Sequence, residues 1–73
     1  MSGEPREIEI RDETIRLGQL LKLAGVADSG GEARELVQQG VVRVNDEIET
    51  RRGRRLRHGD VVEALGERLR VIV

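Results

Sequence analysis

The chain of 73 residues contains no cysteine, phenylalanine, tyrosine or tryptophan, and it has only one histidine and one proline. Without cysteine there is no disulfide framework and no cysteine-ligated zinc site, and one imidazole cannot build a histidine-rich metal site. No apolar run approaches the roughly 20 residues that span a bilayer, and the acidic start does not resemble a signal peptide. We therefore expect a cytoplasmic protein that uses no cofactor, no metal and no membrane.

The size and composition of the chain allow one small domain and no separate catalytic domain. Hydrophobic and charged residues each make up 37% of the chain. A domain this small buries only about 60% of the surface that its unfolded chain exposes, so its stability margin is thin. We predict a mobile tail over residues 1–6 and a single domain over residues 7–73.

The charge of the chain is nearly balanced in total but unevenly distributed. The formal net charge is −1, and the amino-terminal end is acidic, since residues 1–14 contain five acidic residues and two arginines. The segment from residue 51 to residue 57 contains five arginines and no acidic residue: Arg51, Arg52, Arg54, Arg55 and Arg57. A polyanion within a Debye length of about 8 to 10 Å would experience this local positive field.

The first half of the sequence predicts one short strand and two helices. Residues 7–10 alternate polar and apolar side chains, which is typical of a strand with Ile8 and Ile10 facing inward. Residues 15–24 have helical spacing, with Thr14 as a possible cap and a glycine directly after the last turn. Ser29 and Glu32 form a capping-box pattern that starts a second helix, which we expect to end at Gly40.

After Gly40 the pattern changes from helical to alternating. Residues 42–44 and 47–50 read as the strands of a hairpin, joined by the turn pair Asn45-Asp46. We interpret residues 51–55 as an exposed loop, followed by strands over 61–64 and 69–73. This order predicts an α+β domain in which two short helices pack on a small, mostly antiparallel sheet.

Four segments resemble the S4 RNA-binding domain in order and spacing. They are Arg16-Leu17-Gly18-Gln19-Leu20-Leu21, Ser29-Gly30-Gly31-Glu32-Ala33-Arg34, Gln39-Gly40-Val41-Val42-Arg43-Val44-Asn45 and Gly59-Asp60-Val61-Val62. The likeness covers well over half of the chain and extends to the small stand-alone bacterial S4 proteins similar to YbcJ. It implies an S4-like fold with the αL motif. Two positions depart from the family pattern, since Gly30 replaces a common arginine and Asp46 a common glycine.

The resemblance implies that the helix starts, the hairpin and the arginine segment converge on one RNA-binding surface. The residues predicted for it are Arg16, Ser29, Gly30, Gly31, Arg34, Arg43, Asn45, Arg51, Arg52, Arg54, Arg55 and Arg57. Because the chain has no aromatic ring on which bases could stack, we expect recognition of RNA shape and backbone by arginine. With about four to six phosphate contacts, the logarithm of affinity would fall with that of salt with a slope of roughly −3 to −5.

The residues themselves leave alternatives open. A charge run is usually a solvated face, Arg16 and Arg34 could be ordinary helix-surface residues, and Gly30-Gly31 could either seat a phosphate or ease a turn. His58 and the scattered carboxylates show no catalytic arrangement. The hypothesis is a monomeric, non-catalytic protein that binds structured RNA, with ribosomal RNA or a ribosome-associated particle as the target. The alternative is an adaptor whose basic surface binds an acidic protein.

Overall fold

The computed structural model describes residues 4–73, and residues 1–3 of the predicted tail lie outside this range. Arg6, which the prediction assigns to the tail, is the first residue of a strand. The elements are β1 (Arg6–Glu9), β2 (Thr14–Arg16), α1 (Leu17–Leu23), α2 (Gly30–Gln38), β3 (Val42–Val44), β4 (Glu47–Ile48), β5 (Arg55–Arg57), β6 (Val61–Ala64) and β7 (Glu67–Ile72).

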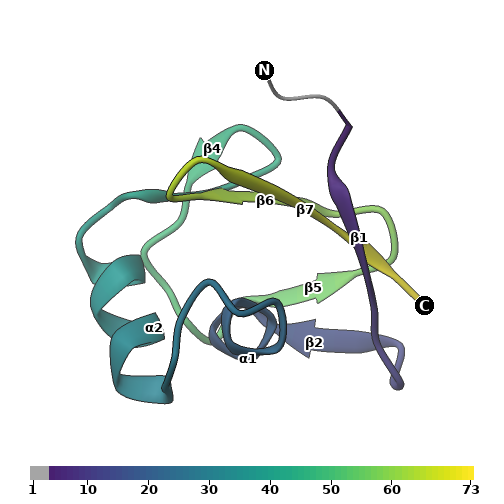
Figure 1. Cartoon of the computed structure of the whole chain (residues 1–73), viewed down its shortest axis with the longest axis horizontal. Coiled ribbons are helices and arrows are strands. Elements are labelled where there is room, and N and C mark those ends of the chain that lie inside the picture. The colour runs from purple at the N-terminus through teal and green to yellow at the C-terminus, as the bar shows by residue number, and fades with distance from the viewer. Residues whose placement is uncertain (1–3) are drawn as a thin grey trace.

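The strands form two sheets. The larger has the order β1-β7-β6-β3-β4, in which only β1 and β7 are parallel, and the smaller pairs β2 with β5 in antiparallel register. The larger sheet lies above α1 and the two-stranded sheet, and α2 stands at one end (Figure 1). The α+β prediction is therefore confirmed, but the expected exposed loop is too long, because Arg55 already begins β5.

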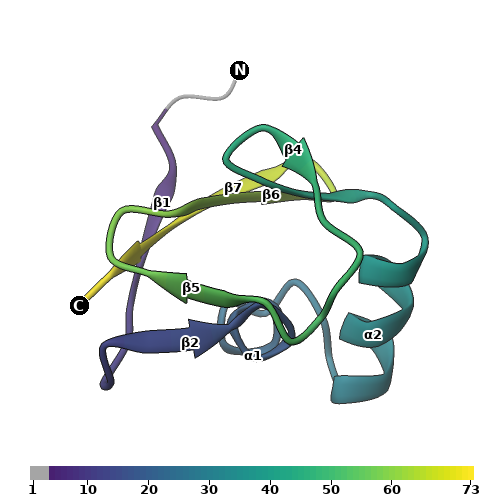
Figure 2. The same ribbon diagram turned by 180° about the vertical axis from the view of Figure 1, so that it is seen from behind.

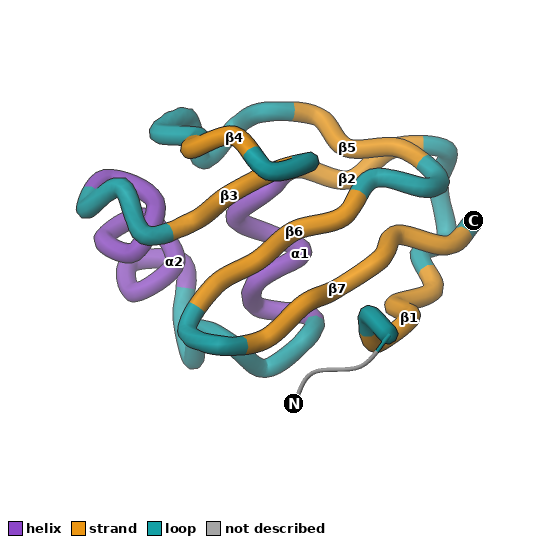
Figure 3. The backbone as a smooth tube through the Cα atoms, turned by 90° about the horizontal axis from the view of Figure 1, so that it is seen from above, coloured by secondary structure: helices purple, strands orange, loops and turns teal. Residues whose placement is uncertain are grey.

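The hydrophobic core lies between the larger sheet and α1. Alternation places Val42 and Val44 of β3 on the inner face and Arg43 on the outer face, as predicted. Leu20 and Leu21 of α1 are fully buried beneath this sheet, as are several valines and leucines of the strands. Viewed from above, the outer face of the larger sheet is uncovered while α1 runs behind it (Figure 3).

Local signals in the sequence explain most element ends. Gly25 and Gly40 follow the two helices with φ of 79° and 76°, and Asn45 and Asp46 have φ of 50° and 72°, which fits a tight hairpin turn. The turn between β6 and β7 is formed by Leu65 and Gly66, with φ of 51° and 80°.

Two predicted caps differ from the structure. Thr14 does not cap α1, because it pairs with β5, and Arg16 is the N-cap residue. The Ser29 Oγ accepts from the Glu32 backbone N–H at 3.1 Å as predicted, but the Glu32 carboxylate accepts from the N–H of Asp28 and not from that of Ser29.

Candidate nucleic-acid interface

A groove lies where the start of α1, the first turns of α2 and the segment between β4 and β5 meet. Figure 2 shows that segment passing beside both helices. The lining residues are Arg16, Gly18, Gln19, Lys22, Gly30, Ala33, Arg52 and Gly53. Three of them are cationic and none is acidic. Among the residues that the structure describes, every charged side chain that lines the groove is therefore positive.

Backbone hydrogen bonds hold the arginine segment against α1. The N–H groups of Leu17 and Gly18 are in the first turn of the helix and have no partner within it. They donate to the carbonyl oxygens of Arg54 and Arg52, each at 2.9 Å. The first turn of α1 is thus capped by the loop, and the same contact places Arg52 at the groove.

The helices contribute further side chains through their spacing. Arg16, Gln19 and Lys22 follow one another at intervals of three, which places them on one side of α1. Arg34 is exposed and lies one turn after Gly30, on the same side of α2. Gln19 and Lys22 are absent from the sequence-predicted site, although their spacing from Arg16 was visible.

The two-stranded sheet extends the positive surface. Arg16 is directly opposite Arg55, and Thr14 is opposite Arg57, while Leu56 between them is fully buried. Arg16 and Arg55 therefore lie next to each other on the exposed side of this sheet. Like charges that face each other across strands destabilise a sheet. We call the surface formed by Arg16, Lys22, Arg34, Arg52, Arg55 and Arg57 the basic face. Within residues 4–73 none of these six side chains forms an ion pair.

Arg51 and Arg54 bind a carboxylate of the protein. Glu49 is only 7% exposed. It accepts from the Arg51 backbone N–H at 3.0 Å, from Arg51 Nε at 2.9 Å and Nη2 at 3.2 Å, and from Arg54 Nη1 at 3.1 Å. The side-chain hydrogen bond from Arg51 is the largest cause that lowers the pKa of Glu49 to about 2, and burial opposes it. The same carboxylate raises the pKa of Arg51.

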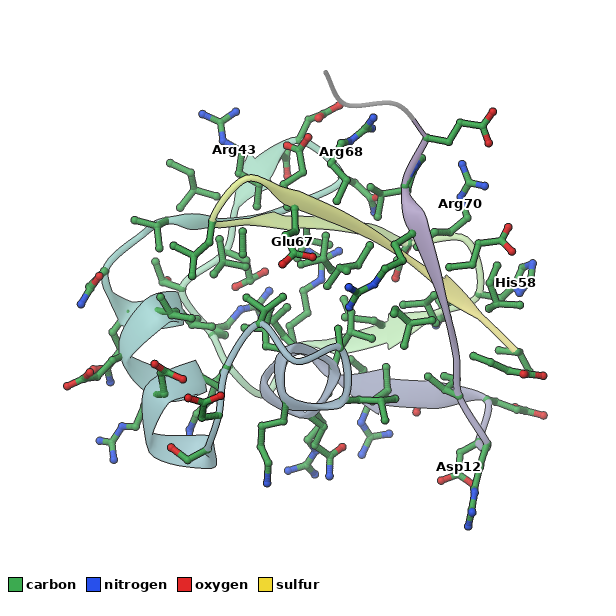
Figure 4. The ribbon with its side chains drawn as sticks, in the orientation of Figure 1. Asp12, Arg43, His58, Glu67, Arg68 and Arg70 are labelled. Atoms are coloured by element: carbon green, nitrogen blue, oxygen red, sulfur yellow. The ribbon has the colours of Figure 1, made fainter. Side chains whose placement is uncertain are left out.

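Arg43 and Asn45 lie apart from the groove. Arg43 points from the outer face of the larger sheet, the side away from the helices, together with Arg68 and Arg70 (Figure 4). The side chain of Asn45 joins the hairpin to the next turn, since its Nδ2 donates to Asp60 Oδ1 at 3.2 Å and its Oδ1 accepts from the Val61 N–H at 3.0 Å. The structure therefore does not bring every predicted residue into one patch.

The start of α2 is open. Ser29 caps the helix, and a Cβ added to Gly30 would meet no atom within 4 Å, while one on Gly31 would meet only the Ser29 Oγ at 3.9 Å. Neither glycine has a φ that requires glycine. The helix start is thus uncovered beside the groove, and its positive dipole end adds to the charge there.

The structure adds no catalytic or metal arrangement in the part that it describes. His58 is exposed, and its Nδ1 accepts from the Val73 N–H at 3.1 Å. Within residues 4–73, no three His, Asp or Glu side chains lie close enough together to hold a metal ion. None of the described helices is long and apolar enough to cross a membrane.

Comparison with known proteins defines the class. The profile of the S4 domain matches residues 8–72, so the chain belongs to the S4 domain family and the resemblance inferred from the sequence is confirmed. A probable ribosome maturation protein of Bacillus subtilis, RlbA, is 54% identical over 59 residues, which are 81% of this chain and 83% of that protein.

Two solved structures have similar folds. The solution structure of YbcJ from E. coli, described as having an αL motif involved in RNA-binding, has a TM-score of 0.73 and 26% identity over the whole of this chain and 94% of YbcJ. Ribosomal protein S4e of Thermoplasma acidophilum has a TM-score of 0.63 and 25% identity over 82% of this chain, which spans only 32% of that protein.

Proposed function

We propose that this protein binds structured RNA without catalysing a reaction, and that its basic face contacts the phosphates. One observation carries the proposal: a groove lined by Arg16, Lys22 and Arg52 has no acidic residue among its lining. Guanidinium groups form bidentate hydrogen bonds with phosphate, so a concave surface of this composition suits a polyanion.

The mode of recognition follows from what the surface can offer. With no aromatic residue in the chain, bases cannot stack on a ring, and the available contacts are to phosphates and 2′-hydroxyls. The basic face continues from the groove to Arg55 and Arg57 on the two-stranded sheet. A continuous row of this kind fits the backbone of a folded RNA.

Ribosomal RNA, or a particle that matures into a ribosome, is the target that we propose. The support is the similarity to a probable ribosome maturation protein over most of both chains, together with the likeness to a ribosomal protein and to YbcJ. Crosslinking in cells followed by sequencing of the attached RNA tests this target directly.

Binding itself is tested by fluorescence anisotropy with a labelled ribosomal RNA hairpin at several salt concentrations. Replacing Arg16, Arg52 and Arg55 by glutamine should weaken binding about a hundredfold at low salt and reduce the salt slope by about two to three, since each lost phosphate contact removes about 0.7 to 0.9.

The matched control replaces Arg43, Arg68 and Arg70, which removes the same charge from the outer face of the larger sheet. We expect this variant to bind within a fewfold of the unchanged protein. Equal losses in the two triple variants would mean that binding follows total charge and not the basic face. If the unchanged protein shows no affinity for RNA at low salt but captures an acidic protein, the adaptor alternative replaces the proposal.

A further inference from the structure

Glu49 is a negative charge at the start of the arginine segment, where it should weaken the attraction of phosphates. Its carboxylate is buried and accepts four hydrogen bonds, all from Arg51 and Arg54. A buried carboxylate with several charge-assisted donors is a strong local contact, and it remains ionised because those donors stabilise its charge. Its neighbours therefore divide into arginines that bind Glu49 and arginines that do not.

We propose that Glu49 is a positioning residue of the basic face: by binding Arg51 and Arg54 it fixes the loop that lies directly before Arg55 of β5 and presents Arg52 to RNA. This inference rests on the proposed function. It assigns Arg51 and Arg54 mainly to the structure of the loop and leaves the phosphate contacts to arginines without an acidic partner.

The hydrogen bonds connect the carboxylate to the groove in two steps. Glu49 holds both ends of the segment 51–54, because it contacts the backbone and side chain of Arg51 and the side chain of Arg54. The carbonyl groups of Arg52 and Arg54 then accept from Gly18 and Leu17 at the start of α1. The acid, the loop and the helix start thus form one connected unit.

The alternative is that Glu49 only neutralises nearby charge, and the two accounts predict opposite effects. Replacing Glu49 by glutamine removes one negative charge and releases two arginines. If total charge decided affinity, this variant would bind RNA more tightly and with a steeper salt slope. If position decides affinity, the loop would adopt the binding geometry in only part of the molecules, and affinity would fall in proportion to that fraction.

The experiment compares Glu49→Gln with Glu63→Gln by RNA anisotropy. Glu63 is a matched control because it pairs with Arg68 at 3.0 Å on the outer face, so its replacement changes the net charge equally. We expect about tenfold weaker binding for Glu49→Gln if about one molecule in ten keeps the loop ordered, and a change of less than about twofold for Glu63→Gln. Equal or tighter binding by Glu49→Gln would overturn the proposal.

A second variant has the same net charge as the unchanged protein. Glu49→Asp keeps the negative charge but shortens the side chain, so one carboxylate can no longer reach both arginines. Weaker RNA binding by this variant at every salt concentration supports positioning, whereas unchanged affinity contradicts it.

Amide hydrogen exchange of the free protein tests the loop without RNA. In Glu49→Gln the amides of Leu17 and Gly18 should exchange about tenfold faster, while the amide of Val71 in β7 keeps its protection and shows that the fold is intact. Unchanged exchange at Leu17 and Gly18 would overturn the positioning role even if RNA binds. Absence of RNA binding by the unchanged protein would instead overturn the proposed function, whatever the exchange rates.

Discussion

The two arginine-bearing surfaces of this protein differ in how their charges are balanced. On the outer face of the larger sheet, Arg68 pairs with Glu63 at 3.0 Å and Arg70 with Glu7 at 3.9 Å. On the basic face, the arginines lack such partners within residues 4–73, and Arg16 and Arg55 directly oppose each other. In a chain of net charge −1, the two surfaces therefore differ in the placement of the acidic residues as well as in the number of basic ones.

The placement of charge on the two surfaces also affects the stability of the protein. Ion pairs on an exposed surface contribute at most about 1 kcal/mol, and opposed like charges cost a similar amount. The outer face thus contains stabilising ion pairs, while the basic face places two like charges opposite each other. Local conflicts of this kind are expected where a surface has to bind a ligand. The difference supports assigning RNA binding to the basic face.

The largest predicted effect concerns the core beneath the basic face. Leu56 is the buried centre of β5, between Arg55 and Arg57. We expect Leu56→Ala to lower the free energy of unfolding by about 3 kcal/mol, because it removes buried methyl groups and leaves a cavity. Urea unfolding measures this loss.

The control for that substitution is Leu65→Ala. Leu65 is 63% exposed in the turn between β6 and β7, so its truncation should change the stability by less than about 0.5 kcal/mol. Similar losses for both variants would mean that the two-stranded sheet is not specifically anchored by Leu56.

The next effect is a pH dependence of stability that comes from Glu49. The pKa of Glu49 is about 2 in the folded protein and 4.5 ordinarily, so its contribution to stability is complete above pH 4.5 and is lost as the pH falls toward 2. We expect a loss of about 2 kcal/mol over this range, since water partly screens Arg51, which is 74% exposed.

Urea unfolding at pH values from 6 to 2 checks this contribution. Glu49→Gln should flatten that part of the stability profile, and Glu63→Gln should leave it in place, since Glu63 pairs with Arg68 and its replacement does not change the donors to Glu49. A profile that is identical for Glu49→Gln and the unchanged protein would contradict the assigned ion-pair cluster.

The sequence predicts the elements whose signals are local. Gly25 and Gly40 mark helix ends through positive φ, and the Asn45-Asp46 turn and the alternation around Arg43 mark the hairpin. These features depend on neighbouring residues only, and the structure confirms them.

The unpredicted features depend on distant contacts. Strands β2 and β5 have three residues each and are about 40 positions apart, so no period could reveal their pairing. The hydrogen bonds of Glu49 were equally invisible, because they form only where the side chains of Arg51 and Arg54 fold back onto the carboxylate. The site prediction therefore treated the segment as a whole and could not separate the arginines that bind Glu49 from those that do not.

The smallest predicted effect is measured by making the same substitution, arginine to threonine, on each of the two faces. Arg55→Thr removes a like-charge pair and adds a residue that favours strands, so we expect a gain of about 0.5 kcal/mol in unfolding free energy. It also removes one proposed phosphate contact, so RNA affinity should fall severalfold. Arg68→Thr breaks the pair with Glu63 and should lose a few tenths of a kcal/mol with unchanged RNA affinity.

Thermal or urea unfolding and anisotropy on the same samples measure both quantities. Opposite signs of the stability change for Arg55→Thr and Arg68→Thr are the expected outcome, because one substitution relieves a repulsion and the other removes an attraction. If Arg55→Thr destabilises the protein, the repulsion between Arg16 and Arg55 is compensated in solution. The basic face would then differ from the outer face in ligand binding alone and not in stability.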